Sequence, residues 1–281
     1  MVFICVNTPA AETQEDGKMG LPSNLNAFKS VLKAIGGATK PDSKHKILVN
    51  KSTVPVGTSK LTVEILQKFL PDKGISEIYT VASMPEFLAE GQAIANLMKP
   101  DRVVIGTPDT QRGNESFEIL KELYGHGHGK IINTRAASAE LGKLMSNAML
   151  AQRISSINSI TGLTEKTQGC EISDVQAIVS SDSRIGSKYL QPSPGFGGSC
   201  FEKDLLSLIH ILDCNGEHQA ALYWQSVLDM NTYQKHRLAK LVAQDLAKQI
   251  RQQQSSNSAA APTVSIFGFA YKKNTSDTRM S

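Results

Sequence analysis

Residues Lys46-Ile47-Leu48-Val49-Asn50-Lys51-Ser52-Thr53-Val54-Pro55-Val56-Gly57 join a short apolar run to a polar turn that precedes a helical pattern. The run Lys46–Asn50 predicts a buried strand, and the helix that we expect over Ser59–Phe69 is stopped by Pro71. Strand and helix patterns alternate in the same way along the first part of the chain. The sequence therefore predicts an α/β fold with a mostly parallel, doubly wound, Rossmann-like sheet.

The neighbouring elements follow from the same alternation. A helix over Leu25–Ile35 is expected to end at Gly36-Gly37, because paired glycines commonly terminate helices. Ligands bind at the carboxyl ends of the strands in such sheets, so the turns after the strands are candidate binding loops. The remaining predicted elements are strands at Val2–Val6, Ile78–Ala82, Val103–Ile105 and Ile131–Ile132, and a helix at Asn114–Tyr124.

The second half of the chain has a different, helical pattern. Apolar residues recur at helical spacing over Ala139–Leu163, which predicts a long helix followed by shorter ones, and again over Gln219–Lys248. Residues 252–261 are rich in Gln, Ser and Ala and are expected to form a loop, after which Val264–Gly268 reads as a strand. We expect four parts: 1–134, 135–250, a low-complexity loop 251–262 and the beginning of another α/β part, 263–281.

Composition limits the class of function. The chain has 281 residues, 40% of them hydrophobic, and a net charge of +4, which suits an anionic small molecule and argues against nucleic acid. No apolar run approaches the roughly 20 residues that span a bilayer, and the N-terminus does not resemble a signal peptide. The cysteines Cys5, Cys170, Cys200 and Cys214 form no C-x-x-C pair, and no His cluster has ligand spacing. We therefore expect neither a metal site nor disulfides, and a reducing, cytoplasmic setting.

The stretch Gly195–Asp204 places one cysteine at the start of a helix expected over Phe201–Asp213. The positive end of a helix dipole favours the thiolate of Cys200, and Lys203 and Asp204 lie within one turn of it. A nucleophilic cysteine would be built in this way. A buried structural cysteine beside a flexible loop is the alternative, and the surrounding glycines and charges favour the nucleophile.

Three other loops follow predicted strands and carry polar groups. Asn7-Thr8-Pro9 follows the first strand, Lys51–Gly57 the second, and Met84–Gly91 the third. Carboxylates at strand ends can act as acid and base or bind ribose hydroxyls. Each loop taken alone is compatible with a solvated surface turn, whereas together, on successive strand ends, they predict one binding crevice.

These segments together resemble the UDP-glucose/GDP-mannose dehydrogenase family, and within it the eukaryotic UDP-glucose 6-dehydrogenases. The resemblance extends over essentially the whole chain apart from the Gln/Ser/Ala-rich insert. The motifs that carry it are Lys51–Pro55, Met84–Gly91, Ala151–Asn158, Gly195–Asp204 and Gly268–Lys273. It implies two successive NAD-linked oxidations of the sugar C6 of UDP-glucose, giving UDP-glucuronate, with 1–134 as part of an NAD-binding domain and 135–250 as a central dimerisation domain.

The resemblance also assigns catalytic roles. It implies that Cys200 attacks an aldehyde to give a thiohemiacetal and then a thioester, that Lys143 stabilises the oxyanion, and that Glu86 acts as acid and base in hydrolysis. Asn147, one helical turn after Lys143, would share the oxyanion site. Asp204 and Thr53 match residues that position or activate water.

The binding residues come from the same resemblance. Arg184 matches an arginine that reaches the sugar nucleotide of a neighbouring subunit, which implies a homo-oligomer built through the central helices. The NAD contacts implied are Val6, Asn7, Thr8, Pro9, Ser52, Thr53, Glu90 and Arg279; the substrate contacts are Glu86, Phe87, Leu88, Glu90, Lys143, Asn147, Arg184, Phe196, Gly197, Tyr271 and Lys272.

The sequence also departs from the family pattern. The Gly-rich pyrophosphate fingerprint is absent and only the first strand of the UDP-binding domain is expected, so we expect a chain truncated at both ends with weak or no turnover by itself. The alternatives are a non-catalytic dimerisation subunit, a GDP-mannose-type specificity, and a partial gene product without a role of its own. The individual departures are Met84, Gln191, Asn274 and Ser276.

Overall fold

The computed structural model describes residues 1–281 except 16, 41, 71–73, 126–128, 256–262 and 280–281. The chain divides into two compact units. The first, which we call the sheet unit, comprises Met1–Asn147 and Leu206–Ala221, and the second, the helical unit, comprises Ala148–Leu205 and Leu222–Ser281. Each unit is described by itself below.

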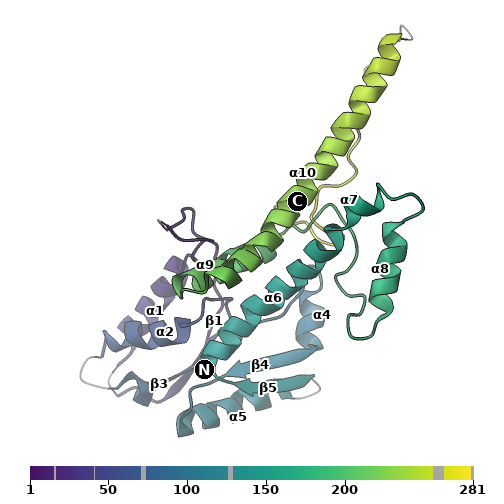
Figure 1. Ribbon diagram of the computed structural model, residues 1–281. Coiled ribbons are helices and arrows are strands. Elements are labelled where there is room, and N and C mark those ends of the chain that lie inside the picture. Colours follow the sequence, from purple (N-terminus) through teal and green to yellow (C-terminus); the bar gives the residue numbers. More distant parts are fainter. Residues whose placement is uncertain (16, 41, 71–73, 126–128, 256–262, 280–281) are drawn as a thin grey trace. The chain divides into compact units, whose positions relative to one another are not determined.

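The sheet unit is built on five strands in the order in which they occur in the chain (Figure 1). The pairs β1–β2, β2–β3 and β4–β5 are parallel, whereas β3 meets β4 antiparallel through a single residue pair, Ser83 and Gly106. The mostly parallel sheet is thus confirmed. The strands are β1 (Val2–Ile4), β2 (Lys46–Asn50), β3 (Tyr79–Ser83), β4 (Arg102–Gly106) and β5 (Lys130–Thr134).

Helices cover both faces of this sheet, because successive side chains of a strand point to opposite faces. On β2, Leu48 belongs to the apolar cluster that contains Phe28 of α1 (Asn26–Ala38) and Leu66 of α2 (Thr58–Gln67). The adjacent Val49 belongs to the cluster that contains Leu120 of α5 (Gln111–Gly125). Burying a side chain of this size stabilises the fold by about 1.5–3 kcal/mol, so the alternation along β2 fixes a helix layer on each face.

The other helices are short except for three that contribute residues to both units. These three are α6 (Ala136–Asn158), α9 (Phe201–Cys214) and α10 (His218–Ser255). The predicted long helix followed by shorter ones, and the helix beginning at Phe201, are therefore confirmed. The short helices are α3 (Ile75–Ile78), α4 (Ala93–Met98), α7 (Thr161–Thr164) and α8 (Ile172–Ser181). Among the described residues, none of these helices has the length and apolar character needed to cross a membrane.

Three expectations about individual elements are wrong. Helix α1 does not end at Gly36-Gly37 but continues to Ala38, and a Cβ atom at Gly36 would lie 2.4 Å from the ring of Phe69, so this glycine permits close packing. Residues 252–255 continue α10 instead of forming a loop, while 256–261 lie outside the described residues. Val264–Gly268 forms no strand, because no described strand pairs with it and Phe267 is exposed.

Candidate active site

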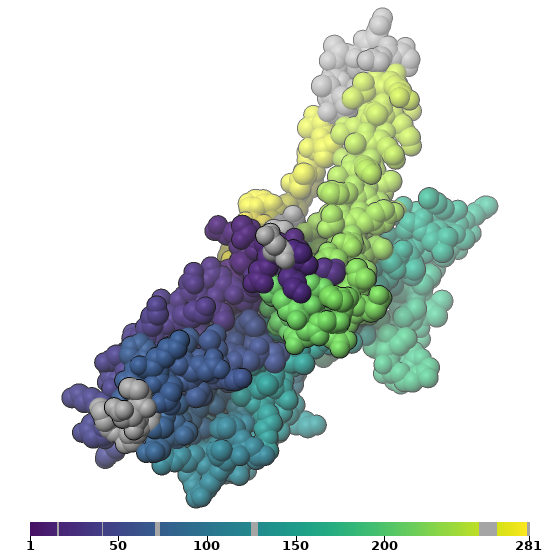
Figure 2. Space-filling view, turned by 60° about the vertical axis from the view of Figure 1, so that its left-hand side comes forward, coloured from purple at the N-terminus to yellow at the C-terminus, as the bar shows by residue number. Residues whose placement is uncertain are grey.

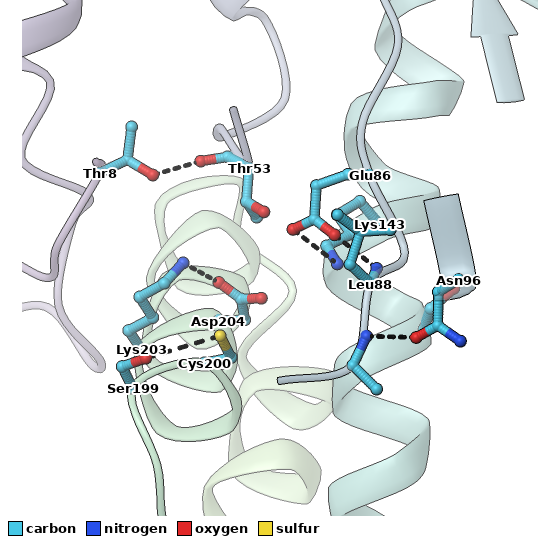
Figure 3. A network of polar contacts seen from close by, with 12 residues as sticks. Thr8, Thr53, Glu86, Leu88, Asn96, Lys143, Ser199, Cys200, Lys203 and Asp204 are labelled. Atoms are coloured by element: carbon cyan, nitrogen blue, oxygen red, sulfur yellow. Dashed lines mark hydrogen bonds and ion pairs between the residues drawn. The ribbon is translucent and has the colours of Figure 1, made fainter. Parts of the chain in front are cut away.

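Glu86 and Lys143 form an ion pair in the sheet unit. Glu86 lies in the loop after β3, and its Oε1 is 3.7 Å from the Nζ of Lys143 on α6 (Figure 3). The other carboxylate oxygen accepts a hydrogen bond from the backbone N–H of Leu88 at 2.5 Å. The Lys143 side chain is only 6% exposed, so its charge acts in surroundings from which most water is excluded. Such a cation interacts more strongly with negative charge than one in bulk water.

Two cations of the same unit lie close to the ring of Phe87. The Lys143 Nζ is 5.1 Å from the ring centroid, and the guanidinium carbon of Arg102 is 4.0 Å from it. The backbone N–H of Ala89, farther along this loop, donates to Asn96 on α4 at 2.8 Å. The loop 84–91 is therefore anchored on both sides, which fixes the position of Glu86.

Lys51 is a further member of this group and is not among the site residues predicted from the sequence. It is half-buried in the turn after β2, with its Nζ 5.6 Å from the ring centroid of Tyr124. Burial lowers the pKa of the Lys51 ammonium group, and Lys143 adds to this effect, whereas Glu86 and Cys5 oppose it. A lysine directly after a buried strand is the only signal in the sequence that could have suggested it.

The turns after β1 and β2 are tied together by hydroxyl groups. The Oγ of Ser52 accepts from the N–H of Val6 at 2.9 Å and donates to the carbonyl of the same residue at 2.7 Å. The hydroxyl of Thr8 donates to the carbonyl of Thr53 (Figure 3). Beneath them the amide nitrogen of Asn50 is buried and has no hydrogen-bond partner among the described residues. The carboxyl ends of two parallel strands therefore present polar groups at one edge, as predicted.

Cys200 lies at the beginning of α9 in the helical unit, where it is exposed. The N–H of Asp204 donates to the Cys200 carbonyl at 3.1 Å and closes the first helical turn, and Ser199 Oγ lies 3.7 Å from the sulfur. Next to the cysteine, Lys203 Nζ is 2.6 Å from Asp204 Oδ1, and the Asp204 side chain is only 3% exposed (Figure 3). Because Cys200 itself is exposed, the alternative of a buried structural cysteine is excluded.

Asn231 of α10 holds the loop that leads to Cys200. Its Oδ1 accepts from the N–H of Phe196 at 2.8 Å, and its Nδ2 donates to the carbonyl of the same residue at 3.0 Å. Gly195 has a φ of 136°, and a Cβ atom there would lie 2.6 Å from Asn231 Oδ1. Phe196 packs edge-on against Phe201 at 5.8 Å between ring centroids. No local sequence pattern predicts this two-point contact.

Residues 271–279 close on the same loop within the helical unit. The N–H of Gly198 donates to the carbonyl of Arg279 at 2.9 Å, and a Cβ atom at Gly198 would lie 2.8–3.0 Å from the Tyr271 ring. The Arg279 guanidinium binds the carboxylate of Asp277 at 2.8 Å and lowers the pKa of that carboxyl to about 2. Lys272 Nζ lies 5.6 Å from the Tyr271 ring centroid.

The predicted site residues are divided between the two units. Arg184, in the helical unit, is exposed, and its guanidinium pairs with the carboxylate of Asp182 at 2.6 Å. The sheet unit contains Val6, Asn7, Thr8, Pro9, Ser52, Thr53, Glu86, Phe87, Leu88, Glu90, Lys143 and Asn147, and the helical unit contains Arg184, Phe196, Gly197, Cys200, Asp204, Tyr271, Lys272 and Arg279.

Comparison with known proteins places this arrangement in a family. A sequence model described as the NAD binding domain of the UDP-glucose/GDP-mannose dehydrogenase family matches residues 1–128, and the model of the central domain of the same family matches residues 137–233. The chain belongs to this family. The two matched segments contain the residue groups around Glu86 and Cys200, so both groups occur within domains of UDP-glucose/GDP-mannose dehydrogenases.

Individual relatives agree with this assignment. The chain is 44% identical to "UDP-glucose 6-dehydrogenase 5" of Oryza sativa subsp. japonica and to "UDP-glucose 6-dehydrogenase" of Drosophila melanogaster; each match covers 99% of this chain and 55% of the relative. A UDP-glucose dehydrogenase from Pyrobaculum islandicum superposes with a TM-score of 0.79 at 31% identity, over 99% of this chain and 58% of that one. The chain therefore spans about half the length of the relatives that it matches.

Proposed function

We propose that this chain carries the reacting residues for NAD-linked oxidation of the C6 hydroxyl of UDP-glucose to the carboxylate of UDP-glucuronate. The observation that supports it best is the exposed Cys200 at the start of α9, beside the Lys203–Asp204 ion pair, in a member of this dehydrogenase family. An aldehyde cannot lose hydride to give an acid until a nucleophile has added to it. A thiolate at a helix N-terminus is such a nucleophile.

The proposed reaction has four balanced steps. The C6 alcohol first loses a hydride and a proton and becomes an aldehyde. The Cys200 thiolate then bonds to C6, the carbonyl π electrons move to oxygen, and this oxygen takes up a proton to give a thiohemiacetal. Loss of a second hydride, together with the hydroxyl proton, converts it to a thioester. Water then attacks C6 and gives up its protons, the C–S bond breaks, C6 becomes the carboxylate of the product, and Cys200 is regenerated as the thiolate. NAD⁺, when bound, accepts one hydride in each oxidation.

Residues of the sheet unit would control charge and protons in these steps. The largely buried ammonium group of Lys143 would stabilise the oxyanion that forms when sulfur adds, and Asn147 would donate to the same oxygen. Glu86, held by the Leu88 N–H, would take a proton from the attacking water. Thr53, whose backbone carbonyl accepts a hydrogen bond from the hydroxyl of Thr8, would position this water. The resemblance assigns the same role to Asp204, which belongs to the helical unit.

The strand ends of the sheet unit suit part of an NAD molecule. The backbone of 6–9 and the Ser52–Thr53 turn present hydroxyls and peptide groups, the donors and acceptors that ribose hydroxyls and a carboxamide require. We propose that 6–9, Ser52, Thr53 and Glu90 hold the cofactor, with Arg279.

The sugar nucleotide would lie along the Cys200 loop. Phe196 and Gly197 offer peptide groups in a backbone held by Asn231, and Tyr271 and Lys272 lie against Gly198 of the same loop. Phe87 and Leu88 would line the sugar, and the exposed Arg184 is free to extend toward an anionic nucleotide of a neighbouring subunit once it leaves Asp182.

A homo-oligomer is the second part of the proposal. Several large apolar side chains of α10 are exposed in the chain, a surface composition typical of subunit interfaces. We propose that a second copy covers them. Light scattering after size exclusion is expected to show a dimer or larger, and Tyr233→Lys is expected to lower the mass. The residues concerned are Leu222, Tyr223, Tyr233 and Leu238.

The decisive experiment traps the covalent intermediate. The Glu86→Gln variant, in which hydrolysis should be slowed, is mixed with UDP-glucose and NAD⁺, quenched with acid and analysed by mass spectrometry. A single round up to the thioester does not require steady turnover, so even a chain with weak turnover is expected to form an adduct of the sugar nucleotide on Cys200 together with the NADH of that one round. Cys200→Ser is expected to form no adduct, and Cys170→Ser is the matched control that retains it. GDP-mannose in parallel separates the two substrate classes. Parent-like NADH formation by Cys200→Ser would refute the thioester mechanism, and a chain that forms neither NADH nor adduct would refute the proposal itself.

A further inference from the structure

Three metal-ligating side chains meet in the sheet unit outside the proposed active site. His210 and Cys214 lie one helical turn apart on α9, with His210 Nε2 3.5 Å from Cys214 Sγ. The Oε2 of Glu15, in the loop after β1, is 3.8 Å from the same nitrogen. The three ligand atoms all lie within 4.8 Å of one another. The sequence predicts no metal site, because it contains no C-x-x-C pair and no His cluster. The three ligands here instead have H-x-x-x-C spacing, with a carboxylate 195 residues away from the histidine.

The separations suit a tetrahedral zinc ion. With zinc bonds of 2.0–2.3 Å to oxygen, nitrogen and sulfur, tetrahedral geometry separates ligand atoms by about 3.3–3.6 Å. The His210–Cys214 distance already has this value, and a rotation of the exposed Glu15 side chain brings its oxygen closer. Thiolate and imidazole donors select zinc over magnesium or calcium, which bind oxygen. One thiolate and one carboxylate also balance the two positive charges of the ion.

The loop that carries Glu15 is held against α9 independently of any metal. The Leu21 N–H donates to the Leu206 carbonyl at 3.2 Å, and the Met19 N–H donates to Asp213 Oδ2 at 3.1 Å. Gly20 approaches so closely that a Cβ atom there would lie 2.4 Å from the Leu206 carbonyl oxygen. In Figure 2 the purple segment after β1 lies directly on the green end of α9. The ligands are thus brought together by the fold, which reduces the entropy lost on binding an ion.

The neighbouring carboxylate of Asp213 does not compete for this position. Its Oδ1 contacts His218 Nδ1 at 2.6 Å and its Oδ2 accepts from the Met19 N–H. Glu15 is therefore the carboxylate available to His210 and Cys214.

We propose that Glu15, His210 and Cys214 bind one zinc ion, with water in the fourth position, and that this ion fastens the loop after β1 to α9. Three protein ligands and one open position are the pattern of exchangeable or reactive zinc sites, whereas closed structural sites use four protein ligands. The Glu15 side chain is 59% exposed, so the ion can enter from solvent. The site uses none of the residues of the proposed oxidation.

Metal titration tests the proposal without any measurement of dehydrogenase activity. The protein is reduced, freed of metal with EDTA, desalted, and titrated with Zn²⁺ in competition with a chromogenic chelator, and then with Co²⁺ to record thiolate-to-metal charge transfer. We expect one ion per chain and a near-ultraviolet cobalt band. Glu15→Gln is expected to weaken zinc binding by about tenfold or more, since losing a ligand costs at least as much as losing an outer-shell partner. Cys214→Ser is expected to abolish the cobalt band, and Cys170→Ser should retain both properties.

Matched measurements make the result decisive. Circular dichroism verifies that each variant is folded, and Glu15→Gln alters an exposed side chain, so its effect does not depend on a variant that fails to fold. Hydrogen exchange of residues 17–23 is expected to slow when Zn²⁺ is added to the parent protein and to stay unchanged in Cys214→Ser. The proposal is overturned if the parent binds no zinc, or if Glu15→Gln and Cys214→Ser bind it as tightly as the parent, because the ion then binds elsewhere on the surface.

Discussion

Asn231→Ala tests how the loop that carries Cys200 is held. Asn231 is 5% exposed, and its amide satisfies both the N–H and the carbonyl of Phe196 at 2.8 and 3.0 Å. Alanine removes both partners and leaves two buried backbone groups, each of which costs about 1–3 kcal/mol when unsatisfied. We therefore expect the free energy of unfolding to fall by about 2–6 kcal/mol. The reactivity of the Cys200 thiol should change as well, because the loop is released.

Urea unfolding followed by the fluorescence of Trp224, the only tryptophan of the chain, measures this loss. Trp224 lies on α10 two turns before Asn231, so the probe reports on the same unit. Thr232→Ala, an exposed neighbour on the same helix, is the matched control and is expected to change stability by less than about 0.5 kcal/mol. If Asn231→Ala loses no more than this control, the two hydrogen bonds do not hold the loop and the reasoning is refuted.

Three further substitutions test other parts of the structure. Glu140 accepts hydrogen bonds from backbone N–H groups at the start of α2, yet burial raises its pKa above the ordinary 4.5. The parent should therefore lose stability as the pH rises from 4.5 through the raised pKa. In thermal melts recorded against pH, Glu140→Gln should not show this loss, and parallel curves for the two proteins would contradict the prediction. Gly198 has a φ of 82° and lies against the Tyr271 ring, so Gly198→Ala should lower the free energy of unfolding by about 1–2 kcal/mol from backbone strain, in addition to the clash with the ring. Limited proteolysis should then cleave residues 271–279 faster than in the parent. Unchanged cleavage would show that this contact does not hold the segment. Lys203→Met removes the ammonium group that lies 2.6 Å from the buried Asp204 carboxylate and should lower the free energy of unfolding by more than about 1 kcal/mol in chemical unfolding. A smaller loss would show that the pair is dispensable.

Much of the sheet unit could be predicted from local sequence. The bounds of β2 were predicted correctly as Lys46–Asn50, and the other strands to within one or two residues, because alternating or continuous apolar runs depend on neighbouring residues alone. The beginning of α9 at Phe201, and with it the position of Cys200 at a helix N-terminus, followed from glycines directly before an apolar helical pattern. The ion pair of Glu86 with Lys143 lay beyond such local patterns, although both residues were selected by resemblance.

The errors occurred where a partner far away in the chain decides the local structure. The paired glycines of α1 continue the helix because Gly36 packs against Phe69, and Val264–Gly268 remains irregular because a strand requires another strand to satisfy its backbone. Lys51 was overlooked for a related reason: its perturbed pKa arises from burial and from charges that the sequence does not place beside it.

The sequence by itself therefore determined the succession of strands and helices, the apolar faces that they bury, and the turns that carry reactive side chains, since each depends on residues a few positions apart. Only the tertiary structure decided which polar groups meet. Asn231 reaches Phe196 across 35 residues, and Glu15 reaches His210 across 195, in contacts that no local periodicity records. Such contacts form because burying the apolar faces fixes the backbone, and the polar side chains then bind whichever groups the packing brings within reach.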